Sequence, residues 1–139
     1  MTVRQVIVGD DGRAKVYRPL PDDQRIAAVR AGLEAYAAGD FFEAHERMEP
    51  AWMGTADLAE RNLIQGLIKV AAADVHAIRG NPAGIRRNLE GARDRLLSGM
   101  GGSISGVDLD VEALVSAIDS RLAGVTGLAT PVAIDWRTR

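Results

Sequence analysis

With 139 residues, of which 47% are hydrophobic, the chain is long enough to bury a substantial core as one globular domain. It has no cysteine, which excludes disulfide bonds and thiolate metal ligands, and its net charge of -2 gives no basic field for a nucleic-acid partner. No window reaches the about 20 apolar residues that span a bilayer, and the first residues lack the apolar run of a secretory signal, so we expect a cytoplasmic protein with no membrane partner.

Residues 1–20 precede the helical part of the chain and contain two short β-branched runs, at 6–8 and 16–17. An Asp-Asp-Gly turn signal at 10–12 separates the two runs. Because an isolated two-stranded ribbon is only marginally stable in water, this segment is either a small hairpin that leans on the rest of the protein or an extended arm. We favour the arm.

Residues 21–125 have the apolar spacing of a helical domain. The first helix follows a proline-rich start, with Asp22 or Asp23 as its cap. Asp40 caps the second helix, and Glu43 three residues later completes an arrangement that resembles a capping box. Both helices therefore have local sequence support.

Pro50 lies inside the second predicted helix. A proline in a helix lacks the N–H that bonds the carbonyl four residues earlier, and its ring crowds that turn. We therefore expect a kink or an early end of the helix near Glu49, with the helix over in any case before Gly54.

Three further helices follow. A long helix is expected over 57–79, because a Gly-Asn-Pro break at 80–82 ends it and begins the next helix, which runs to about residue 97. After a glycine-rich linker, Asp108 or Asp110 caps a last helix that closes near residue 124. We expect an all-α fold, an antiparallel bundle of about five helices.

The residues after the last helix form a third segment, 126–139. It contains Trp136, and a tryptophan in an irregular segment commonly marks a docked segment. We therefore expect the tail to pack back over the bundle.

The second helix carries the clearest candidate site. His45 and Glu49 are one turn apart and share a face with aromatic and sulfur side chains at positions 41, 42, 48 and 52. A buried imidazole or carboxylate needs a partner or a ligand. The long helix carries a matching polar stripe of Gln65, Lys69 and His76.

If this stripe faces the second helix, two imidazoles and one carboxylate meet between the helices. His45, Glu49 and His76 would then form a site for a divalent metal, zinc or iron, with a position open for water. Glu46 would be the catalytic general base.

Several motifs together resemble the family called domain of unknown function 309. They are the run Phe-Glu-Ala-His-Glu at 42–46, the Gln-Gly-Leu-Ile-Lys run at 65–69 and the Gly-Asn-Pro break, within a resemblance that covers about residues 28–97. The resemblance implies an all-α fold and a small cytosolic protein from a family whose function is not established. Some classifications label the family a predicted metal-dependent hydrolase on the basis of its His and Glu positions. The positions that match the family pattern are His45, Glu49, Trp52, Gln65 and His76. We assign substrate contacts to Trp52, Gln65 and Lys69.

Other functions fit the same residues. Lys69 would repel a metal, so Glu49 could instead pair with Lys69 or His76, and His45 with Gln65, in a buried polar network that has only a structural role. A third alternative is a non-catalytic module that binds a small molecule or an anion, another protein or a second copy of the chain. Whether the protein is an enzyme stays open at this point.

Overall fold

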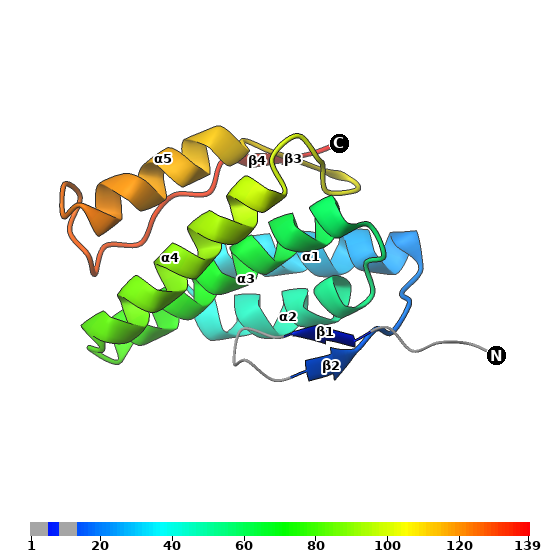
Figure 1. Ribbon diagram of the computed structural model, residues 1–139, viewed down its shortest axis with the longest axis horizontal. Coiled ribbons are helices and arrows are strands. Elements are labelled where there is room, and N and C mark those ends of the chain that lie inside the picture. The colour runs from blue at the N-terminus through cyan, green and yellow to red at the C-terminus, as the bar shows by residue number, and fades with distance from the viewer. Residues whose placement is uncertain (1–5, 9–13) are drawn as a thin grey trace.

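Five helices lie within the described part of the chain, which in the computed structural model is residues 6–8 and 14–139, with side chains described from residue 17 onward (Figure 1). Consecutive helices pack against one another, and the contacts of α3 with α4, of α1 with α2 and of α2 with α3 are the most extensive. This arrangement confirms the predicted all-α class and the bundle of about five helices. The helices are α1 (Asp22–Ala37), α2 (Phe41–Met53), α3 (Leu58–Ile78), α4 (Pro82–Ser98) and α5 (Val111–Leu122).

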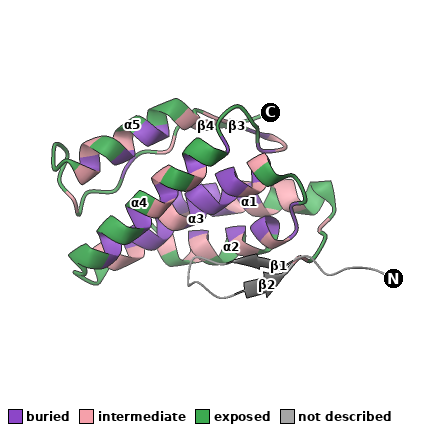
Figure 2. Cartoon of the chain, in the orientation of Figure 1, coloured by how far each residue is buried: buried purple, intermediate pink, exposed green. Residues whose placement is uncertain are grey.

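Helix α3 is the centre of the core. It has α2 on one side and α4 on the other, and most of its residues between 60 and 74 are buried (Figure 2). This environment explains its composition, because a helix covered on several sides needs apolar residues around most of its circumference. No helix in the described ranges is long and apolar enough to cross a membrane.

The caps predicted for α2, α4 and α5 are present, whereas the cap predicted for α1 is not, and α3 has a cap that was not predicted. Helix α1 begins directly after Pro21 without a side-chain cap, so the predicted capping role of Asp22 or Asp23 is wrong. Asp22 instead accepts a hydrogen bond of 2.6 Å from the guanidinium of Arg25 on the next turn. Before each of the other helices, a side chain accepts a hydrogen bond from the backbone N–H three residues later. These capping residues are Asp40, Asp57, Asn81 and Asp110.

Helix α2 continues through Pro50 and ends at Met53, so the expected early end near Glu49 is wrong. Ala51 and Trp52, in the turn after the proline, are buried in the core. Their burial offsets the one backbone hydrogen bond that proline cannot make, because tertiary packing supplies most of the stability of a helix in a protein.

Two antiparallel strand pairs lie outside the bundle. Strands β1 (Val6–Val8) and β2 (Ala14–Val16) pair antiparallel within the N-terminal arm, which agrees with the hairpin alternative for residues 1–20. The turn signal at 10–12 lies outside the described residues. Strand β3 (Val107–Leu109) pairs with β4 (Trp136–Thr138), which brings the end of the chain back beside the start of α5 (Figure 1).

A buried polar network attaches the C-terminal segment to the core. The guanidinium of Arg121 and the carboxylate of Asp74 are fully buried and lie 2.6 Å apart. Arg121 also donates through Nε to the carbonyl of Leu128, at 2.7 Å. The hydroxyl of Tyr36 is 2.7 Å from both the Asp74 carboxylate and the carbonyl of Val132. Residues from α1, α3 and α5 thus hold the tail by two of its carbonyl groups.

Burial also shifts the pKa of Asp74 and of Tyr36 in this network. Desolvation raises the pKa of Asp74 above its ordinary value, in spite of the opposing effects of Tyr36 and Arg121. Desolvation, followed by the charge of Asp74, raises the pKa of Tyr36 as well. The tyrosine is therefore neutral at physiological pH and acts as a hydrogen-bond donor.

Glycine allows α3 and α4 to approach closely at Gly66. A β-carbon there would lie 2.7 Å from the side chain of Leu96, which is fully buried, whereas one at Gly91 would meet only the flexible stem of Lys69 at 3.1 Å. We expect Gly66→Ala to lower the free energy of unfolding by about 1–2 kcal/mol through overpacking. Gly91→Ala, the matched control, should be neutral or stabilising by up to about 1 kcal/mol because alanine favours helix. Urea denaturation measures both, and equal effects of the two variants would contradict this account of the α3–α4 contact.

Candidate functional site

One imidazole and two carboxylates gather on the exposed side of α2. His45, Glu46 and Glu49 each place one possible ligand atom within 4.8 Å of the others. Nδ1 of His45 is 3.4 Å from a carboxylate oxygen of Glu46 and 3.9 Å from one of Glu49. The helix produces this grouping locally, because Glu49 is one turn beyond His45 and Glu46 is its direct neighbour.

The three side chains differ in exposure. His45 is 17% exposed, Glu49 23% and Glu46 54%. The imidazole and one carboxylate are thus partly shielded from water, while the second carboxylate reaches into solvent. Glu46 is therefore the member of the group that an ion in solvent would meet first.

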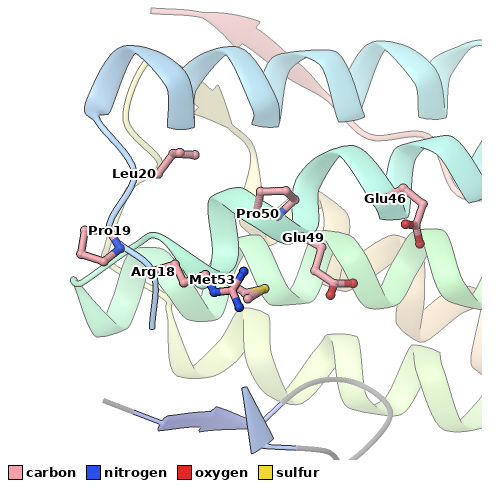
Figure 3. Close-up of a pocket in the computed structure, with 7 residues that line it drawn as sticks. All are labelled: Arg18, Pro19, Leu20, Glu46, Glu49, Pro50 and Met53. Carbon is pink, nitrogen blue, oxygen red and sulfur yellow. The ribbon is translucent and has the colours of Figure 1, made fainter. Parts of the chain in front are cut away.

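A pocket of about 320 Å³ adjoins the two carboxylates (Figure 3). It lies between the second half of α2 and the extended segment before α1. Its polar lining consists of Arg18, Glu46 and Glu49. The rest of the lining is apolar and comes from Pro19, Leu20, Pro50 and Met53.

Backbone contacts hold the two walls of this pocket together. The N–H of Arg18 donates to the carbonyl of Met53 at 3.0 Å, and the N–H of Leu20 donates to that of Gly54 at 3.4 Å. A β-carbon on Gly54 would lie 2.5 Å from that of Leu20, so this close approach depends on glycine. Segment 18–20 is therefore a fixed wall, set against the end of α2.

His76 does not join the group on α2. It lies in the last turn of α3, where its Nδ1 is 3.1 Å from the side-chain nitrogen of Asn81 and its ring lies against Gly84 of α4. The predicted ligands were His45, Glu49 and His76. Within the described residues, the group close enough to share an ion is His45, Glu46 and Glu49, so Glu46 takes the place predicted for His76. The physical reason is that this part of the α3 stripe faces α4 rather than α2.

The three residues assigned to substrate contacts lie away from the pocket lining. Trp52 is only 4% exposed and packs in the core, and Gln65 is also 4% exposed. The stem of Lys69 lies beside Gly91 of α4. The pocket instead uses Arg18, which sequence reasoning missed because nothing in the local pattern shows that segment 18–20 pairs with the end of α2.

The five packed helices and the group on α2 define a small helical-bundle protein with a candidate cation site. Residues 29–88, less than half of the chain, match the model of the family described as Domain of unknown function (DUF309), and this match confirms the resemblance seen in the motifs. The match begins within α1 and ends within α4, and it includes the whole of α2 and α3. Neither a curated protein nor a solved structure matches the chain.

Proposed function

We propose that the protein binds a divalent transition-metal cation, zinc or iron, through His45, Glu46 and Glu49. The observation that carries the proposal is the mutual distance of their ligand atoms, all within 4.8 Å. Imidazole and carboxylate groups are ligands that both metals accept in proteins. The partial exposure of the group leaves room for water or a substrate on the side that faces solvent.

The neighbouring pocket supports a hydrolytic role. We propose metal-dependent hydrolysis of a small molecule that binds between segment 18–20 and α2. When bound, such a cation acidifies a water ligand and polarises a substrate oxygen. In this proposal the apolar lining of the pocket holds the body of the substrate, and Glu46 and Glu49 hold the cation at the edge of the pocket. In this proposal the pocket residues replace Trp52, Gln65 and Lys69 as the substrate contacts.

A second candidate is a non-catalytic module in which the same residues form a structural polar network. His45, Glu49, Gln65 and Lys69 each take part in at least one hydrogen bond, ion pair, ring contact or electrostatic interaction, so none of them is free. This observation favours the network, because a satisfied network needs no ion. The two candidates differ in whether an ion binds and in whether the protein melts when His45 is removed.

Zinc titration of the untagged protein, stripped of metal by a chelator, tests the first candidate. We expect one zinc per chain in isothermal titration calorimetry, and His45→Ala should weaken binding by about 100-fold or more, since loss of even an indirect partner of a ligand costs about 10–100-fold. His76→Ala is the matched control, because His76 lies outside the group on α2, and it should bind zinc as the wild type does.

Thermal unfolding of the same variants separates the two candidates. In the proposed cation site, His45→Ala folds normally and zinc raises the melting temperature of the wild type but not of the variant. A chain that binds no zinc, and that melts markedly lower when His45 is replaced, would instead establish the network. Hydrolysis of p-nitrophenyl acetate and p-nitrophenyl phosphate by the zinc-loaded protein then measures the activity, which Glu49→Gln should reduce.

A further inference from the structure

The pocket beside the candidate metal centre has two chemically different parts. Glu49 and Glu46 lie along α2, and Arg18 lies toward the end of the helix that bears Met53 (Figure 3). Between and around these charges the wall is apolar. A ligand that fills the pocket would therefore need one polar or charged group near these three side chains and an apolar part against the rest of the wall.

The sign of the charge in this pocket depends on the cation. With both glutamates ionised, the lining carries two negative charges and the one positive charge of Arg18. A divalent cation on His45, Glu46 and Glu49 reverses that balance and leaves an excess of positive charge. Because unlike charges attract strongly where water is partly excluded, the loaded pocket favours an anion and the empty one does not.

Arg18 is well placed to contact such an anion. Its backbone is fixed to the carbonyl of Met53, so its side chain starts from a defined position on the pocket wall. The ion pairs found among the described residues do not include Arg18. A planar guanidinium binds carboxylate and phosphate groups through two parallel hydrogen bonds.

We propose that the substrate class of this pocket is a small organic anion, a carboxylate or phosphoryl compound with an apolar body. Its anionic group lies between the bound cation and Arg18, and its body packs on Leu20, Pro50 and Met53. This inference rests on the proposed function, because the cation supplies the excess positive charge. Arg18 is the residue that selects the anion, and it has no part in holding the metal.

Phenylphosphonate is a suitable probe, because it combines an apolar ring with an anion that cannot be hydrolysed. We expect it to bind the zinc-loaded protein in calorimetric titrations and to bind the zinc-free protein at least about tenfold more weakly. Arg18→Gln should weaken probe binding to the zinc-loaded protein by about 10–100-fold and leave zinc affinity unchanged. Arg87→Gln, which removes an exposed arginine from α4, should change neither affinity.

Failure of the inference is distinguishable from failure of the proposed function. If zinc binds as expected but Arg18→Gln binds the probe as well as the wild type does, the substrate class is wrong and the metal site stands. Stronger binding of cyclohexylammonium than of phenylphosphonate to the zinc-loaded protein would also overturn the substrate class. If zinc does not bind at all, both proposals fail, and the zinc titration alone reveals it.

Discussion

Replacing Asp74 with alanine is expected to lower the free energy of unfolding by about 3–5 kcal/mol. The guanidinium of Arg121 is fully buried against Asp74, so the variant would leave a positive charge in the core without its counterion. Removal of one partner of a buried ion pair is among the most destabilising single changes, because the remaining charge has lost its hydration and gains nothing in return. The variant would also remove one of the two acceptor oxygens that lie 2.7 Å from the hydroxyl of Tyr36.

A double variant shows how much of the lost stability comes from the unpaired charge on Arg121 and how much from loss of the ion pair itself. Nη1 and Nη2 of Arg121 and Oδ1 of Asp74 make no hydrogen bond of good geometry among the described residues, although Nη2 and Oδ1 are close. The hydrogen bonds of this pair do not fully offset the desolvation of its two charges. Asp74→Ala combined with Arg121→Met, which buries no charge, should therefore recover a large part of the stability that Asp74→Ala loses. Chemical denaturation at neutral pH measures the free energy of unfolding of both variants. A loss of less than about 1 kcal/mol in Asp74→Ala would contradict the role of this pair, and so would a double variant that is no more stable than Asp74→Ala.

Replacement of Trp52 is also expected to lower the stability of the protein strongly. Trp52→Ala should cost about 3–5 kcal/mol of stability, because the side chain is only 4% exposed and its removal leaves a cavity between α2 and the core. Trp52→Phe, which keeps an aromatic ring in place, should cost distinctly less. Thermal and urea denaturation followed by circular dichroism report the loss.

This variant also bears on the assignment of Trp52 to substrate binding. A tryptophan whose main role is contact with a substrate would be replaceable at little cost in stability, while ligand binding would fall. Full stability of Trp52→Ala would therefore favour the assignment of Trp52 to substrate binding and contradict its role in the core. The expected result, a large loss of stability, leaves the pocket residues as the contacts.

Helix positions were predictable because the signals that define them are local. Asp40, Asn81 and Asp110 cap helices through bonds to N–H groups only three residues away, and those residues are visible in the sequence. The group on α2 was partly predictable for the same reason, since His45 and Glu49 are one turn apart on the same helix. Asp74 was a detectable signal that was missed, because a lone carboxylate inside the apolar part of α3 needs a buried partner.

The all-α class, most helix starts and the approach of His45 to Glu49 follow from the sequence alone, because each depends on spacing along one helix. The end of α2 does not, because burial of Ala51 and Trp52 carries that helix past Pro50. Three features depend on tertiary packing: His76 faces α4, Arg18 lines the pocket, and Arg121 pairs with Asp74. These features depend on how helices rotate and pack against one another. The periodicity of a single helix shows which residues share a face, but it does not show which neighbour that face will meet.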